Sequence, residues 1–269
     1  MSALVVDLDG VVYLGDRPIP GARQALEKCE RSGHEIWFAT NSSLRTPEEA
    51  ADKIRRVTGY EAQPQQVVTS AMAAARLAGT LGVRKALVVG GSGVRHAVTT
   101  QGIDIVNDPW SADVVVVGLD LDLRYDTVRD ACLAIRNGAR FIATNLDPSY
   151  PMPDGQWPGA GAIVELVRVA SGVDPTSTGK PDVAMIDLIA ERIGSHTDIW
   201  MIGDRPSTDL AMAKTAGWRS VLVLTGVVDS AADVPARWTP DLVIDSIADL
   251  PDELERLIGQ PVDEPPPHH

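Results

Sequence analysis

The 269-residue chain contains few of the residues that identify several protein classes. It has only two cysteines, Cys29 and Cys132, and they do not have the spacing of metal ligands. Aromatic residues make up 4% of the chain, and basic residues are not interleaved with them as in a surface that stacks nucleic-acid bases. We therefore expect buried, inert thiols in a reducing cytoplasm and no cysteine-bound metal.

Positive charge and long apolar runs are also scarce. The 24 Lys and Arg residues face 37 Asp and Glu residues, and the net charge of −13 argues against nucleic acid or an anionic membrane as a partner. The apolar run 114–117 is far too short to span a bilayer. No signal peptide is recognisable, so we expect a cytoplasmic protein. The Pro-rich segment 260–269 predicts a disordered tail, and the sequence does not settle whether His268 and His269 are native.

Strand-like and helix-like segments alternate along the chain. Short apolar runs typical of buried strands occur at 4–6, 35–40, 86–89, 103–106, 114–117, 141–143, 199–202, 220–224 and 242–244. Helical spacing or helix-start signals occur at 22–31, 46–49, 71–81, 127–136, 181–193 and 207–216. The alternation predicts an α/β protein with parallel sheets and right-handed crossovers.

The middle third has strands of its own and predicts a second α/β unit, inserted between two outer segments. The stretch 147–161 is rich in Pro and Gly and predicts a loop. In parallel sheets the functional site lies at the carboxyl ends of the strands. The candidate functional residues all lie at such an end or one loop later.

Two acidic clusters follow strand-like runs far apart in the sequence. Asp7 and Asp9 follow the first run, and Asp204 and Asp209 follow the run at 199–202. Carboxylates brought together at strand ends would repel one another and raise one another's pKa unless a cation lay between them. We therefore predict a Mg²⁺ site that includes Asp7 and Asp204, with Asp209 holding metal-bound water from outside.

The first cluster also contains candidates for the chemistry. Asp7 is the candidate nucleophile, because carboxylate attack on phosphorus gives an aspartyl-phosphate and divides a difficult reaction into two easier steps. Asp9 is the candidate acid and base, since it could protonate the leaving oxygen and later activate water.

Phosphate also needs hydrogen-bond donors and a cation. Thr40, Asn41 and Ser42 end the second strand-like run with hydroxyl, amide and backbone N–H groups. Lys180 precedes a predicted helix and supplies the positive charge that the acidic chain otherwise lacks.

These motifs, in this order, resemble those of the haloacid dehalogenase (HAD) superfamily. They are Asp7-Leu8-Asp9-Gly10, Thr40-Asn41, Gly179-Lys180-Pro181 and Gly203-Asp204-Arg205 with Thr208-Asp209. The segments 125–147, 158–162 and 222–227 narrow the resemblance to the NagD-like phosphatases. It covers roughly residues 3–258.

The resemblance implies a Rossmann-like catalytic core at 1–80 and 178–259, with an α/β cap for substrate specificity at 81–177. It also implies Mg²⁺-dependent hydrolysis of phosphate esters. In this family pattern Asp7 and Asp204 bind the metal through their side chains and Asp9 through its backbone carbonyl. The same resemblance allows a homodimer formed through the cap, which no sequence feature reveals.

Other interpretations remain open from the residues alone. A receiver-like or phosphate-binding module also uses Asp, Thr and Lys at strand ends, but such modules are shorter and do not carry their phosphorylated Asp on the first strand. A phosphotransferase or mutase would differ only in the acceptor. The glycines at 90–93 do not complete a dinucleotide fingerprint, and Gly179-Lys180 lacks the other residues of a P-loop.

The expected partner is a small phosphorylated metabolite. Asn145 and Asp147 lie in the predicted cap and could contact a hydroxylated leaving group, which hints at sugar, polyol or glycolate phosphates. Both residues could equally be turn formers. Nucleotides remain open as substrates.

Overall fold

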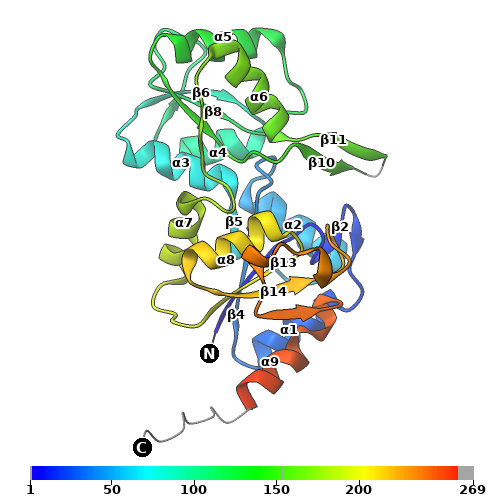
Figure 1. The fold of residues 1–269 in the computed structure, drawn as a ribbon. Helices are drawn as coiled ribbons and strands as arrows, with labels where there is room; N and C mark the ends of the chain where they lie inside the picture. The colour runs from blue at the N-terminus through cyan, green and yellow to red at the C-terminus, as the bar shows by residue number, and fades with distance from the viewer. Residues whose placement is uncertain (1, 153, 260–269) are drawn as a thin grey trace, which may run out of the picture.

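The computed structural model describes residues 2–152 and 154–259, which form two parallel sheets, each with its own helices (Figure 1). The predicted α/β class is confirmed. The predicted tail at 260–269 lies outside the described residues.

The six-stranded sheet, called the core sheet below, is built from the two ends of the chain. Its order is β15-β14-β13-β1-β4-β5, and all neighbouring strands are parallel. The strands are β1 (Ala3–Val6), β4 (Glu35–Thr40), β5 (Val67–Thr69), β13 (Ile199–Gly203), β14 (Arg219–Val223) and β15 (Leu242–Ile244).

Alternate residues of the core sheet pack on opposite faces, as the two-residue period of a strand requires. Leu4 and Val6 face α1 (Ala22–Arg31), α2 (Pro47–Thr58) and α9 (Leu250–Gly259). Ala3 and Val5 face α7 (Val183–Ile193) and α8 (Ala211–Ala216). Burial on both faces explains the continuous apolar run of β1, and it fixes where the strand ends and Asp7 begins.

The five-stranded sheet, called the second sheet below, comes from the middle of the chain, in the order β12-β9-β8-β6-β7. Its strands are β6 (Lys85–Val89), β7 (Asp104–Ile105), β8 (Val114–Val117), β9 (Arg140–Ala143) and β12 (Thr176–Ser177). Helices α5 (Tyr125–Arg136) and α6 (Ala160–Ser171) cover one face, and α4 (Ser92–Thr100) lies on the other.

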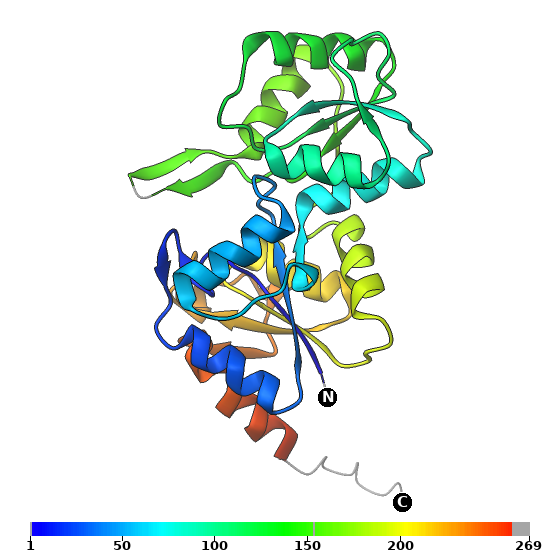
Figure 2. The ribbon, with the colours of Figure 1, turned by 180° about the vertical axis from the view of Figure 1, so that it is seen from behind.

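Helix α3 (Ser70–Thr80) packs against both sheets. Ala73 belongs to the apolar cluster beneath the core sheet, whereas Ala71, Ala74, Ala75 and Ala78 belong to the cluster beneath the second sheet. The figures show this helix between the two sheets (Figures 1 and 2). The two units therefore share one helix in addition to the chain crossings.

The prediction of a loop at 147–161 is wrong. The structure has an antiparallel hairpin of β10 (Ser149–Met152) and β11 (Gly155–Pro158), and α6 begins at Ala160. Its backbone extends sideways from the second unit (Figures 1 and 2). Proline is tolerated here because both strands of an isolated ribbon are edge strands. A smaller hairpin, β2 (Tyr13–Leu14) with β3 (Arg17–Pro18), follows the first acidic cluster.

The helix predicted at 207–216 differs in its first half. Residues Pro206–Leu210 form a π-helical turn that leads into α8. The wider turn lets the side chain of Asp209 fold back, so that its Oδ2 accepts a hydrogen bond from the Arg205 backbone N–H at 3.1 Å. Short 3₁₀ helices occur at Pro64–Gln66, Ala231–Asp233, Ala236–Trp238 and Ile247–Asp249.

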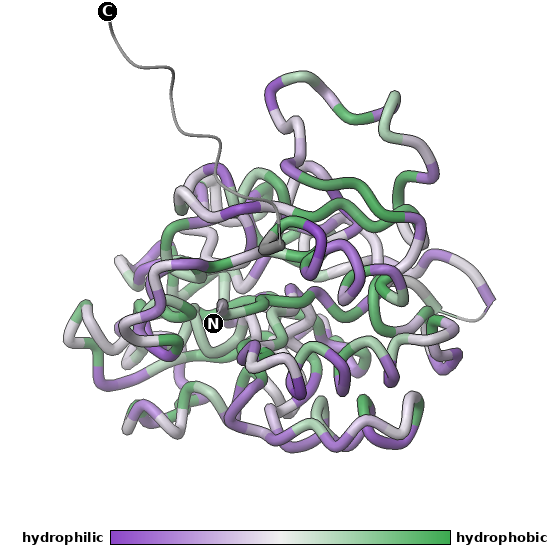
Figure 3. Tube along the Cα trace, turned by 90° about the horizontal axis from the view of Figure 1, so that it is seen from below, coloured by the Kyte–Doolittle hydropathy of each residue, from purple (hydrophilic) through white to green (hydrophobic). Residues whose placement is uncertain are grey.

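The hydropathy of the residues varies between the interior and the outside of the molecule. Viewed from below, several extended hydrophobic stretches run through the molecule, while many of the outer turns are hydrophilic (Figure 3). Among the described residues, no helix combines the length and apolar character needed to cross a membrane.

Candidate active site

The predicted site residues converge at one edge of the core sheet. Strands β13, β1 and β4 are neighbours, so Asp204, Asp7 and Thr40 lie at adjacent carboxyl ends. A cavity opens at this edge and is lined by residues of both units. Core residues in its wall include Asp7, Asp9, Thr40, Asn41, Ser42, Lys180, Asp204 and Asp209, and the second unit contributes Leu119, Asn145, Asp147, Ser149 and Tyr150.

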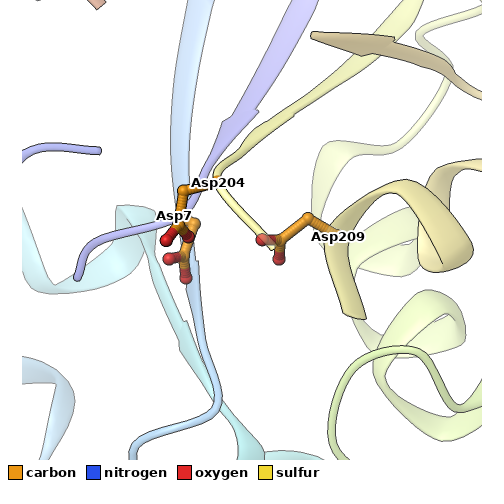
Figure 4. A group of neighbouring side chains, drawn as sticks. All are labelled: Asp7, Asp204 and Asp209. Carbon is orange, nitrogen blue, oxygen red and sulfur yellow. The ribbon is translucent and has the colours of Figure 1, made fainter. Parts of the chain in front are cut away.

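Three carboxylates form the centre of the site. Asp7, Asp204 and Asp209 each place a carboxylate oxygen within 4.8 Å of the others, and all three residues are buried. Figure 4 shows Asp209 facing the other two from the π-helical turn. Among the residues that the structure describes, the Asp9 carboxylate is not part of this cluster.

Burial and the neighbouring carboxylates both disfavour the negative charge of this cluster. Burial raises the pKa of Asp7 well above its ordinary value, against the lowering effect of Lys180. Burial, followed by the Asp209 carboxylate, raises the pKa of Asp204 to about 6. A buried set of three carboxylates, two of them in contact with one lysine, is a donor set that fits a hard divalent cation.

Lys180 is the cation inside the cluster. Its Nζ donates to Asp7 Oδ1 at 2.5 Å and to the carbonyl of Ala39 at 2.9 Å, and it lies 2.8 Å from Asp209 Oδ1. Burial lowers the pKa of Lys180, but the carboxylates of Asp209 and Asp7 outweigh burial and raise it. The lysine therefore stays charged and holds the carboxylate of Asp7 in place.

Glycines allow the backbone to approach Asp204 closely. Gly10 has a left-handed φ of 95°, and a Cβ at Gly10 or at Gly226 would collide with the Asp204 carboxylate. Asp204 Oδ2 accepts a hydrogen bond from the Val227 N–H at 2.7 Å. The predicted motif at 222–227 thus wraps around the second acidic cluster.

The predicted phosphate-binding residues fall into two kinds. Thr40 lines the cavity, and the buried hydroxyl of Ser42 has no hydrogen-bond partner among the residues that the structure describes. Asn41 instead binds the backbone of Lys180, accepting from its N–H at 2.7 Å and donating to its carbonyl at 3.2 Å. The side-chain amide of Asn41 therefore positions the lysine.

Asp9 faces the cavity with little restraint. In the described parts of the chain its carboxylate accepts no hydrogen bond, and its ion-pair partner is Lys53 Nζ at 3.9 Å. Burial raises the pKa of Asp9, with Lys53 and then Arg45 opposing the shift. A carboxyl group facing the cavity in this way is placed to exchange a proton with a bound group.

The two residues predicted as substrate contacts of the cap behave differently. Asn145 is buried and donates to the carbonyl of Asn41 at 2.6 Å, while its Oδ1 accepts from the Asp147 N–H at 3.0 Å. Asp147 accepts from Asn41 Nδ2 at 3.1 Å and lies 3.6 Å from Arg205 Nη1. The turn-forming interpretation fits Asn145, and both residues connect the second unit to the core.

Sequence reasoning assigned no role to three residues beside the cavity. Lys53 contacts Asp9, Arg205 pairs with Asp147, and Arg45 Nη1 donates to the Tyr150 hydroxyl at 3.5 Å. Arg205 lies within the motif Gly203-Asp204-Arg205, and Arg45 closely follows the predicted phosphate-binding residues 40–42. Their position near the site could therefore have been predicted from the sequence. Lys53 gave no signal, because lysine in an amphipathic helix ordinarily faces water.

Comparisons with known proteins agree with this geometry. A sequence model of haloacid dehalogenase-like hydrolases matches residues 4–104, and a model of HAD-hydrolase-like proteins matches residues 177–250. The chain is 37% identical over 258 residues to an acid sugar phosphatase of Staphylococcus aureus, covering 95% of this chain and 98% of the relative.

Solved structures give the same picture. Glycerol phosphate phosphatase from Mycobacterium tuberculosis in complex with calcium matches with a TM-score of 0.86 and 33% identity over 92% of this chain and 74% of the other. A magnesium complex of that enzyme matches with a TM-score of 0.84 and 34% identity over 92% of this chain and 75% of the other. A p-nitrophenyl phosphatase from Archaeoglobus fulgidus matches with a TM-score of 0.85 and 28% identity, covering 93% and 98%.

Proposed function

The chain belongs to the haloacid dehalogenase-like hydrolases, as a phosphatase of the NagD-like group, and we propose that it hydrolyses small phosphomonoesters through an aspartyl-phosphate on Asp7. The observation that carries the mechanism is the position of Asp7. It is buried at the end of β1, held by Lys180, and lies in a cavity that the Asp9 carboxyl group also lines.

The first half-reaction forms the phosphoenzyme. An Asp7 carboxylate oxygen forms a bond to phosphorus, and the bond between phosphorus and the ester oxygen breaks. Asp9 gives its proton to that oxygen, so the product leaves as an alcohol. The Lys180 ammonium and the hydroxyls of Thr40 and Ser42 hold the phosphate oxygens, whose charge spreads during transfer.

The second half-reaction releases phosphate. Asp9, now ionised, takes a proton from water as the water oxygen attacks phosphorus. The bond between phosphorus and Asp7 breaks, inorganic phosphate leaves, and both aspartates return to their starting states. Because Asp9 acts first as an acid and then as a base, its carboxyl group must face the cavity in both half-reactions.

We propose Mg²⁺ as the metal of this site. Asp7 and Asp204 would hold it with their carboxylates and Asp9 with its backbone carbonyl, while Asp209 stays on Lys180 and the Arg205 backbone. When bound, Mg²⁺ supplies positive charge that offsets the clustered carboxylates and the phosphate. The Mg²⁺ complex of the similar mycobacterial enzyme supports this choice of ion.

We propose that the unit at 81–177 acts as a cap that selects the leaving group. Its side chains in the cavity wall are largely polar, and the similar enzymes are named for sugar and glycerol phosphates. Small sugar and polyol phosphates are therefore the proposed substrates, with glycolate phosphate and nucleotides as the next classes to test. Within the cavity, the Ser149 and Tyr150 hydroxyls suit a hydroxylated leaving group.

Phosphate release tests this proposal. The purified protein is incubated with p-nitrophenyl phosphate and with a panel of sugar, polyol, glycolate and nucleotide phosphates, with Mg²⁺ or with a chelator. We expect turnover only with the divalent ion, and loss of at least about a thousandfold in Asp7→Asn, because this change removes the nucleophile.

The matched control is Asp108→Asn, which removes an exposed carboxylate from a loop outside the cavity and should leave turnover unchanged. Turnover that persists in chelator would contradict the metal assignment. An Asp7→Asn variant as active as the wild type would contradict the covalent mechanism.

A further inference from the structure

A buried lysine on helix α2 has no part in the two half-reactions above. Lys53 is 7% exposed, although Arg56, one turn along the same helix, has a side chain that is 63% exposed. Lysine is rarely buried without a partner, because burial disfavours its charge. The position of the Lys53 ammonium group therefore requires an explanation.

Two groups surround that ammonium. Lys53 Nζ lies 3.9 Å from the centre of the Tyr13 ring and 3.9 Å from Asp9 Oδ1. Tyr13 is itself buried, so the ring is a fixed surface against which the ammonium rests. Helix α2 fixes the other end of the side chain.

The contact with Lys53 also restrains the orientation of the Asp9 carboxyl group. Within residues 2–152 and 154–259, Lys53 is the basic side chain that pairs with Asp9, and no hydrogen bond restrains that carboxyl group. The Asp9 side chain is 31% exposed and lines the cavity. Without a restraint, such a group would rotate between orientations, only some of which reach a leaving oxygen.

We propose that Lys53 is a positioning residue for Asp9. Its ammonium group, held between helix α2 and the Tyr13 ring, keeps the Asp9 carboxyl group turned toward the leaving oxygen. Lys53 is not among the residues that line the cavity, and it acts on the reaction through Asp9. This inference rests on the proposed function, because it assumes that Asp9 transfers the proton.

A comparison of two substrates whose leaving groups differ in basicity tests such a role. p-Nitrophenolate departs readily without a proton, whereas the more basic phenolate depends more strongly on proton donation. Phenyl phosphate and p-nitrophenyl phosphate have nearly the same shape, so their contacts with the cap differ little. A fault confined to proton transfer should therefore affect phenyl phosphate more strongly, while a general structural fault should affect both equally.

The experiment measures kcat/KM for both substrates at saturating Mg²⁺ in Lys53→Met, Lys53→Gln and Lys53→Arg. We expect the neutral variants to lose at least about tenfold on phenyl phosphate and less than about threefold on p-nitrophenyl phosphate. Lys53→Arg keeps the cation and should retain a ratio near that of the wild type. Arg56→Met removes an exposed cation from the same helix and should change neither value.

The ratio of the two kcat/KM values cancels any fraction of unfolded protein in a preparation. If Lys53→Met yields no folded protein, the ratio in Lys53→Gln against Lys53→Arg decides. An active wild type with the same ratio in all variants overturns the inference and leaves the proposed function intact. A wild type that cleaves neither substrate overturns the proposed function itself.

Discussion

Gly226 lets the backbone close around the Asp204 carboxylate. A methyl group at this position would collide with Asp204 Oδ2, the atom that also accepts the Val227 N–H. The side chain could avoid the collision only by rotating away from the acidic cluster. The glycine therefore determines where an oxygen of Asp204, a proposed metal ligand, can lie.

Gly226→Ala should weaken Mg²⁺ binding and lower kcat/KM at limiting Mg²⁺ by at least about tenfold, with a change in unfolding free energy within about 2 kcal/mol. Mg²⁺ titration of activity and thermal unfolding measure the two effects. Gly79→Ala is the control, since its new methyl group meets only the flexible end of Gln101 and should add up to about 1 kcal/mol of stability. Unchanged Mg²⁺ dependence in Gly226→Ala would contradict this account of Asp204.

Among the elements, the turn after β9 joins the second unit to the loop after β4, the proposed phosphate-binding loop. Asn145 donates across the junction to the Asn41 carbonyl, and within its own turn its Oδ1 accepts from the Asp147 N–H. Because its amide is buried and satisfied, we expect it to shape the turn and not to select substrate.

Asn145→Ala should lower the free energy of unfolding by about 1–3 kcal/mol, since it removes two hydrogen bonds, one to the Asn41 carbonyl and one from the Asp147 N–H. It should reduce activity on sugar, polyol and nitrophenyl phosphates by one common factor. Asn137→Ala, at an exposed helix end, is the matched control and should change stability by less than about 0.5 kcal/mol. Different factors for different leaving groups would make Asn145 a substrate contact.

The elements show which features the sequence could reveal. The Thr46 helix start was predictable because a capping box is a local pattern, and the structure contains it. The hairpin of β10 and β11 was not predictable, because its Pro and Gly residues are typical of a loop and all four residues of β11 are exposed.

The same division holds within the site. Asp7, Thr40, Lys180 and Asp204 each stand in a short motif at the end of a strand or in a loop. The hydrogen bonds between Asn41 and the Lys180 backbone join residues 139 positions apart, and no local pattern reports them. Lys53 was hidden for a different reason, since its burial depends on Tyr13 and Asp9, which lie on other elements.

The whole molecule is strongly acidic, and this affects its choice of ions. A net charge of −13 raises the local concentration of divalent cations around the protein. Monovalent salt screens this attraction over a distance of about 8–10 Å at physiological ionic strength. The affinity for Mg²⁺ should therefore depend on salt.

Raising the ionic strength from about 10 to about 150 mM should weaken Mg²⁺ binding about threefold or more. Calorimetric titration of the phosphate-free enzyme measures the effect. Tetramethylammonium chloride in place of KCl separates screening from direct competition for the site, because the bulky cation does not fit among carboxylates. A salt-independent affinity would show that only the local cluster determines binding.

Helix α3 gives the two sheets a shared surface composed mainly of alanine methyl groups. Methyl groups have no rotamers and form low ridges, so they do not interlock as leucine side chains do. Opening of the cavity between the units can thus proceed as a shear, with packed helices sliding over small side chains while both apolar clusters remain buried. In a molecule built this way, access to the catalytic edge requires little exposure of apolar surface to water.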